Sequence, residues 1–178
     1  MPLDTPLPFG LRDVKLTPYG GLPADAVDLP VARTFSFSES EDFEELRGDD
    51  GVQAVHGNGP SVDWELESGG VPLEAIVIMF GGTVTETGVT PNIIKTYEKS
   101  RNDVRPYFQA EGQAISDSGG DFHVLLTRCR ATGELSGEMA DGAFWLTGTS
   151  GQALPDEDNS DIVYSFVQNE SETAIPTS

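Results

Sequence analysis

Strict alternation of apolar and polar residues is the feature of this sequence that most restricts its fold. In the stretch VDWELE, residues 62–67, apolar side chains alternate with Asp63, Glu65 and Glu67. Because successive side chains of a strand point to opposite faces of a sheet, this pattern predicts a half-buried strand in an antiparallel sheet. One face of that strand then belongs to a core, and the other, acidic face meets solvent.

The same alternation recurs along the chain and predicts a mainly β fold. Two turn sequences are expected to join neighbouring strands as hairpins, SDSGGD at 116–121 and the Asp141-Gly142 pair. We therefore expect an antiparallel β-sandwich or barrel. The other predicted strands span residues 10–17, 33–40, 92–97, 106–115, 122–130, 133–139, 143–148 and 161–167.

One α-helix is expected to flank the sheet near residues 72–81. Pro72 suits a first helical turn, and Glu74 lies near the positive end of the helix dipole. The Gly81-Gly82 pair ends the segment. The apolar face of this helix would cover the core side of the sheet.

The domain organisation follows from where the alternation stops. Residues 9–167 are expected to form a single domain, with a long acidic loop at 41–60 between two strands. Residues 1–8 and 168–178 are rich in Pro, Thr, Ser and Glu. Such segments lack the apolar residues for a core, so we expect an N-terminal arm and a flexible C-terminal arm.

Charge and cysteine content exclude several functional classes. Thirty acidic residues against ten basic ones give a formal net charge of −20. This charge repels both nucleic-acid backbones and anionic lipids, so specific binding to either is not expected. The single cysteine, Cys129, cannot form an intramolecular disulfide, and the opening residues carry no signal-peptide pattern. We expect folding in a reducing cytoplasm and no membrane span.

No motif in the sequence completes a catalytic site. The chain lacks a phosphate-binding P-loop and a serine nucleophile elbow. Cys129 with His123 or His56 is a conceivable nucleophile pair, but a lone cysteine on a strand is more often a small core residue. We therefore predict no catalytic residues and no enzyme activity.

A calcium loop is the nearest approach to a metal site. The stretch DEDNSD, residues 156–161, has oxygen ligands at alternate positions, but its sixth position is Asp161 instead of glycine and its twelfth is Val167 instead of glutamate. A looser calcium site there, or at Asp49 and Asp50, is one alternative. A solvated run of charges is the simpler interpretation. We predict no metal and no cofactor, and a structural role.

Four stretches of the chain carry a resemblance to a known family. They are the opening PFGLRDVKLTP, the strand ARTFSFSES, and the longer stretches VHGNGPSVDWELESGGVPLEAIVIMFGG and RPYFQAEGQAISDSGGDFHVLLTRCRATG. With the order of the elements, they resemble the major tail proteins (tail tube proteins) of long non-contractile-tailed bacteriophages, especially those of actinobacterial hosts. The resemblance covers nearly the whole chain.

The resemblance implies a β-sandwich with a flanking helix that forms hexameric rings. In this family the rings stack into a hollow tail tube, through which DNA leaves the capsid. The implied partners are further copies of the chain and the tail initiator, tape-measure and tail terminator proteins. The protein would be a virion component, assembled in the bacterial host cytoplasm.

The resemblance also implies which residues line the bore of the tube. By the family's element order, the lining strands are those near 33–40, 61–67, 106–115 and 122–130. A wall of carboxylates repels DNA over about 8 Å at physiological salt, so DNA would pass without specific binding. The polar faces of two of these strands would place six residues toward the bore: Asp63, Glu65, Glu67, Gln109, Glu111 and Gln113.

The long loop at 41–60 is expected to contact an adjacent ring, as the corresponding loop does in the family. Its apolar candidates for burial in that contact are Phe43, Leu46, Val52 and Val55. We also expect a basic cluster to pair across an interface with acidic residues such as Glu41 and Glu44. This basic cluster consists of Lys95, Lys99, Arg101 and Arg105.

Two other interpretations stay open. One is a related ring protein, either a secretion-system tube or a tail terminator, which shares the fold and is separated from a tail tube by how its rings stack. The other is a monomeric β-sandwich module that binds calcium or carbohydrate. Its exposed platforms would be Trp64, Trp145 and Tyr107.

Overall fold

A single antiparallel sheet dominates the computed structural model, which describes residues 5–70 and 72–176. Its strands lie in the order β2-β1-β7-β8-β9-β4-β3, and β10 pairs with β8. Together with one α-helix, α1, these strands confirm the predicted mainly β, antiparallel fold class. The strand bounds are β1 Pro8–Pro18, β2 Val27–Asp28, β3 Ala32–Gly48, β4 Gly51–Gly69, β7 Phe108–Ser116, β8 Asp121–Ala131, β9 Leu146–Ala153 and β10 Tyr164–Asn169.

Strand β8 is the branch point of this sheet. Its residues 121–126 pair with β10, whereas its residues 129–131 pair with β9. The branching lets the sheet curl, so β3 comes into contact with β1 although the two lie far apart in the strand order. Phe35 of β3 also packs on β7, where a Cβ on Gly112 would lie 2.5 Å from its ring. The glycine at this position therefore permits the curl.

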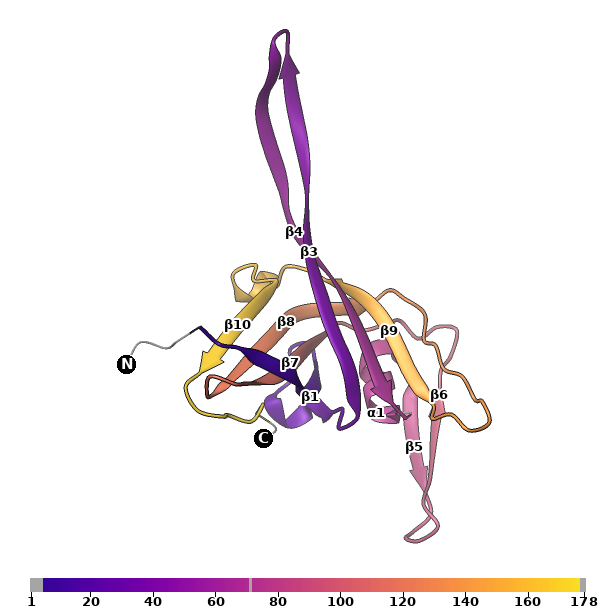
Figure 1. Ribbon diagram of the computed structural model, residues 1–178. Coiled ribbons are helices and arrows are strands. Elements are labelled where there is room, and N and C mark those ends of the chain that lie inside the picture. Colours follow the sequence, from indigo (N-terminus) through magenta and orange to yellow (C-terminus); the bar gives the residue numbers. More distant parts are fainter. Residues whose placement is uncertain (1–4, 71, 177–178) are drawn as a thin grey trace.

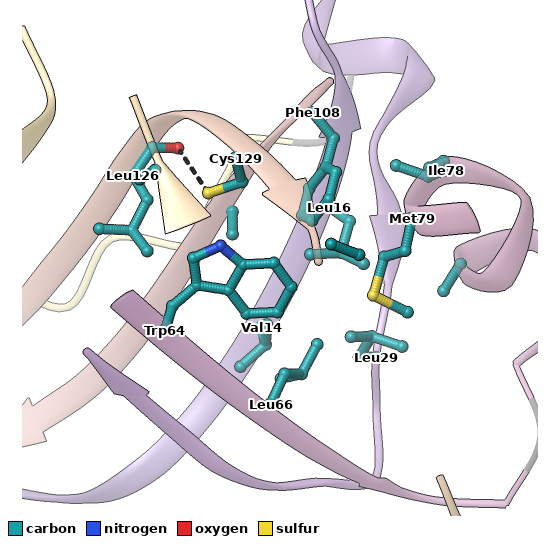
Figure 2. Close-up of a cluster of buried hydrophobic side chains, with 14 of the residues drawn as sticks. Val14, Leu16, Leu29, Trp64, Leu66, Ile78, Met79, Phe108, Leu126 and Cys129 are labelled. Carbon is teal, nitrogen blue, oxygen red and sulfur yellow. Dashed lines mark hydrogen bonds between the residues drawn. The ribbon is translucent and has the colours of Figure 1, made fainter. Parts of the chain in front are cut away.

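The hydrophobic core lies inside the curl (Figure 2). Trp64 of β4 is 2% exposed and meets the ring of Phe108 edge-on, with ring centroids 5.6 Å apart. Both residues point inward, as the alternation in their strands predicts. An aromatic pair of this geometry contributes about 1 kcal/mol beyond the burial of its apolar area.

Helix α1 (Leu73–Phe80) closes one side of the core and matches the predicted helix. It ends at Gly81, whose φ of 74° lies in the region that favours glycine. A Cβ there would also lie 2.6 Å from the carbonyl oxygen of Val104. The buried side chains of the helix are Ala75, Ile76, Ile78, Met79 and Phe80.

The segment predicted as a long loop at 41–60 is a β-hairpin. Strands β3 and β4 continue their pairing to Gly48 and Gly51, on either side of a tight turn at Asp49 and Asp50. The sequence pattern obscured this extension because the hairpin has no buried face, and alternation marks only strands with one face in a core.

The prediction of a strand at 133–139 is wrong, and the strand predicted at 143–148 lies further along the chain. Residues 132–145 run as an irregular segment whose Ser136 makes a single bridge to Gly148. The strand β9 begins only at Leu146. The backbone at Gly137 packs against the Trp145 ring, which a Cβ at this position would approach to 2.4 Å. This contact, instead of a ladder of hydrogen bonds to a neighbouring strand, explains part of the error.

Two further strands, β5 (Thr83–Thr87) and β6 (Ile94–Glu98), form a separate hairpin next to α1. This hairpin points away from the tip of the β3–β4 hairpin (Figure 1). Two short 3-10 turns, η1 (Pro23–Asp25) and η2 (Glu157–Asn159), complete the fold. In the described part of the chain, no helix combines the length and the apolar composition needed to cross a membrane.

Candidate assembly surfaces

The outer part of the β3–β4 hairpin, residues 41–60, projects from the body of the molecule (Figure 1). We call it the projecting hairpin. All its residues are exposed except Gly57, which is half-buried. An isolated two-stranded hairpin is only marginally stable in water, because it buries too little surface to offset the entropy of ordering it. This element has the properties of a surface that is completed by another molecule.

The projecting hairpin combines apolar and acidic side chains. Phe43 and Leu46 are 61% and 66% exposed, and Val52 and Val55 are also exposed. Phe43 pairs with Gly57 and lies on the same face as Val55, since Glu45 and Val55 form a pair two residues further along. The hairpin also carries six carboxylates and one arginine: Glu41, Asp42, Glu44, Glu45, Asp49, Asp50 and Arg47.

The basic cluster lies at the opposite end of the molecule, beside α1 and the β5–β6 hairpin (Figure 1). Three of its four members bind groups of their own chain. The Lys95 ammonium lies 2.5 Å from the Glu74 carboxylate, and Lys99 donates to the carbonyl of Phe80 at the end of α1. Arg105 donates to the carbonyls of residues 131 and 133, at 2.9 and 2.7 Å.

Arg101 differs from the rest of the basic cluster. It is exposed, and within residues 5–70 and 72–176 no hydrogen bond or ion pair involves its side chain. The predicted partners Glu41 and Glu44 lie on the projecting hairpin, so no pairing with the basic cluster occurs within one molecule. Pairing between them requires a second copy.

The six residues predicted for the bore lie on one face of the sheet, opposite to the core. Asp63, Glu65 and Glu67 alternate with the buried residues of β4 and are paired with residues of β9. On β7, Gln109 and Glu111 are half-buried, whereas Gln113 is only 4% exposed because the C-terminal segment covers it.

Arg130 lies between the predicted bore residues of β4 and those of β7, and the sequence analysis did not place this cation there. Arg130 of β8 lies in register with Gln152 of β9, which itself pairs with Asp63. The Arg130 guanidinium lies 5.1 Å from the centre of the Tyr107 ring, a cation–π distance. The alternation of Arg128 and Arg130 around the core residue Cys129 was the signal for this position. The polar face is therefore mixed in charge.

The residues considered for chemistry lie apart. Cys129 is buried in the core, where its thiol contacts the carbonyl of Leu126 (Figure 2), and burial raises the pKa of this thiol. His56 is exposed on the projecting hairpin, and His123 is buried on the opposite face of β8 from Cys129. A thiolate nucleophile activated by a histidine is therefore not assembled.

The acidic segment 156–161 is used for local structure. The Asp156 carboxylate accepts hydrogen bonds from the hydroxyl of Tyr19, at 2.5 Å, and from the backbone N–H of Asp158, at 3.2 Å. In the described part of the chain, no three His, Cys, Asp or Glu residues lie where they could hold a metal ion together. Of the predicted platforms for a carbohydrate, Trp64 is in the core, which contradicts its role as an exposed platform.

Comparison with solved structures finds similar folds over nearly the whole chain. A cryo-EM structure of the anti-feeding prophage cap, the tube terminating cap, matches 95% of this chain and 95% of its own, with a TM-score of 0.53 and 8% identity. A chain of the PVC sheath-tube complex, from an extracellular contractile injection system in the extended state, matches 94% of this chain and 95% of its own, with a TM-score of 0.51 and 12% identity.

No protein-family model and no curated protein matches the sequence. The structural likeness extends over nearly the whole chain, and at these identities it establishes the fold alone. That fold is the one found in the anti-feeding prophage cap and in the sheath-tube complex of the extracellular contractile injection system.

Proposed function

We propose that this chain is a structural subunit of a phage-tail-like tube, in which hexameric rings stack head to tail. The observation that carries the proposal is the polarity of the molecule. An acidic hairpin with exposed apolar residues projects from one end, and the basic cluster lies at the other end. Surfaces that differ at the two ends but complement each other generate open, repeating assemblies.

The charges at the two ends favour stacking in one direction. The projecting hairpin carries six carboxylates and one arginine. Residues 83–105 carry four cations and three carboxylates, which is a positive segment in a chain of net charge −20. Apolar residues are exposed there as well, among them Val89, Ile94 and Val104. In a stack, the projecting hairpin of one copy would therefore lie against residues 83–105 of a copy in the next ring.

The proposed role in a bacteriophage is that of the major tail protein, and the tube would conduct DNA into the host. The acidic residues Asp63, Glu65 and Glu67 support this assignment, because the part of the polar face that they form repels DNA. In such a tail the chain would also contact a tail initiator, a tape-measure protein and a tail terminator. The role is structural and not enzymatic.

A second candidate is a tube-terminating ring, and the likeness to the anti-feeding prophage cap favours it. A terminator uses one end of its ring for the tube and leaves the other end free. The two candidates therefore make different predictions for the purified protein, because only the rings of a tube subunit bind further rings of the same chain at both ends.

Electron microscopy of the purified chain at high concentration tests both candidates. Hollow tubes of uniform width would support the tail-tube subunit, and single rings that never stack would support the terminator. The proposal is wrong if the purified chain forms neither tubes nor rings and also stays monomeric when it is mixed with preformed tubes or baseplates of its own particle.

A further inference from the structure

The C-terminal segment, residues 170–176, crosses the face of the sheet that is opposite to the core. We call it the strap. Its Ile175 is 3% exposed but does not belong to the core cluster, because it packs on the other side of the sheet. The predicted flexible C-terminal arm therefore includes a docked portion, and residues 168 and 169 belong to β10; residues 177–178 lie outside the described part.

Three side chains from three strands hold the backbone of the strap. The Asp121 carboxylate accepts from the N–H of Thr173 at 2.7 Å. The Gln113 amide donates to the carbonyl of Thr173 at 3.0 Å, and the Lys15 ammonium donates to the carbonyl of Ile175 at 3.0 Å. We call Lys15, Gln113 and Asp121 the clamp. The clamp binds peptide groups, as a neighbouring strand would.

Asp121 is the centre of the clamp and is fully buried. Burial raises the pKa of its carboxyl, but hydrogen bonds from Thr173, Asn169, Gln113 and His123 outweigh burial and lower the pKa to about 2. The carboxylate is therefore ionised at all physiological pH values and accepts strongly from the strap N–H.

His123 supports Asp121 from the same face of β8. Its Nε2 lies 3.1 Å from Asp121, and its Nδ1 lies 2.7 Å from Glu111 of β7. Burial lowers the pKa of His123, but these two carboxylates outweigh burial and raise it. The nearby charges on β1 are Lys15 and Asp13, which form an ion pair at 3.5 Å.

The strap has little else to hold it. In the described part of the chain, no backbone-to-backbone hydrogen bond joins residues 171–176 to a strand. Apart from Ile175, all of these residues are exposed. Its remaining ion pair, between Arg12 and Glu172, is exposed and 3.5 Å long. Segments with few buried contacts open locally at much lower free energy than the strands beneath them.

We infer that the clamp holds the strap reversibly, so that the strap leaves the sheet and returns while β7 and β8 stay paired. Departure of the strap uncovers Gln113 and Asp121, whose side chains bind its backbone. In a tube, this motion would decide whether these two residues are presented to the bore, and that consequence rests on the proposed function. The opening itself is a property of the single chain and is tested on the chain alone.

Amide hydrogen exchange of the full chain, resolved by NMR, tests this inference. The Thr173 amide should exchange about 100-fold faster than the ladder amides of β7 and β8, because it opens without unfolding of the sheet. The variant Gln113→Leu removes one hydrogen bond to the strap and should speed Thr173 exchange by about tenfold. The ladder amides of β7 and β8 should keep their rates.

Gln109→Leu is the matched control, because Gln109 lies on the same strand and the same face, and no hydrogen bond joins its side chain to the described residues of the strap. It should leave Thr173 exchange unchanged. If Gln113→Leu does not fold, Lys15→Met removes a second contact of the clamp and should give the same acceleration. Exchange of Thr173 at the rate of the ladder amides, or equal effects of the variants at 113 and 109, would overturn the inference.

Discussion

Gly151 lies where strands β8 and β9 come together over the core. A Cβ at this position would lie 2.1 Å from the carbonyl oxygen of Arg130 and 2.5 Å from the ring of Trp64. The neighbouring Gly148, in the same strand, has its nearest atom at 3.4 Å. Glycine is therefore required by space at 151 and not at 148, although both interrupt the same alternating pattern.

The variant Gly151→Ala should lower the free energy of unfolding by about 1–3 kcal/mol, because the methyl group forces apart a backbone and a buried indole. Gly148→Ala is the matched control in β9 and should change stability by less than about 0.5 kcal/mol. Urea unfolding of both variants measures the difference. Equal stability of the two variants would show that β8 and β9 are further apart at Gly151.

His123 and Asp121 predict a stability profile with pH. The pKa of His123 is raised above 6.5 in the folded protein, so its contribution is complete below pH 6.5 and is lost as the pH rises through the raised pKa. The pKa of Asp121 is lowered from 3.8 to about 2, so its contribution is complete above pH 3.8 and is lost as the pH falls toward 2. Stability from this pair should be greatest between pH 4 and 6.5.

Asp121 should contribute about 2 kcal/mol to the free energy of unfolding at neutral pH, because its pKa is lowered to about 2 and the group is fully buried. Denaturant unfolding between pH 2 and 9 measures the profile. His123→Gln should flatten the decline above pH 6.5, whereas His56→Gln, a change at an exposed site, should leave it in place. A decline that persists in His123→Gln would assign it to other groups.

At the scale of elements, the projecting hairpin is independent of the domain that carries it. Its base is the pair Ser40 and Ser61, whose hydroxyls lie 3.2 Å apart. Beyond this pair none of its side chains belongs to the core. Its conformation therefore contributes little to the stability of one molecule, and its apolar residues are available to another.

Replacement of residues 41–60 by Asn-Gly should leave the monomer folded and prevent stacking of rings. The two-residue turn fits an antiparallel pair such as Ser40 and Ser61. Circular dichroism should show a melting temperature within about 5 °C of the parent, because the core is unchanged. Electron microscopy would then show single rings or monomers. A serine variant of Phe43, Leu46, Val52 and Val55 keeps the hairpin length and should have the same effect.

Tubes formed by the shortened chain would show that the hairpin is not the contact between rings. Tubes formed only by the serine variant would assign the contact to the backbone and the charges of the hairpin, and not to its apolar side chains.

At the scale of the whole molecule, the separation of charge gives a test of head-to-tail stacking. Arg101 is the suitable residue because, unlike Lys99, it has no partner in the described part of its own chain. Arg101→Glu should weaken the contact between rings by about tenfold in association constant, since it places a carboxylate opposite the acidic hairpin. Light scattering against protein concentration measures the threshold for assembly.

Arg12→Glu is the control, since Arg12 is also an exposed cation but lies on β1, away from the basic cluster. It should leave the assembly threshold unchanged. Added salt should raise the threshold of the parent protein and reduce the difference between the two variants, because these exposed charges are screened. If Arg101→Glu leaves the assembly threshold unchanged, charge pairing does not contribute to the proposed contact between rings.

The sequence by itself determined the elements that have one buried face. Alternation located β1, β4, β7 and β8, and the Pro72 and Gly81 signals located α1, because burial imposes a period that can be counted along the chain. It also determined the acidic face of β4 and the inward direction of Trp64. The resemblance to tail tube proteins pointed to the fold class that the solved structures share.

Tertiary structure decided the features that have no such period. The projecting hairpin is exposed on both faces, so its strands carry no alternation and read as a loop. The cations Lys95, Lys99 and Arg105 bind carbonyls and a carboxylate elsewhere in their own chain, and their pairing with another copy stays a prediction. Gln113 was expected at an open face, and the strap, 60 residues later, covers it. These outcomes depend on contacts between distant segments, which the local pattern of a sequence does not encode.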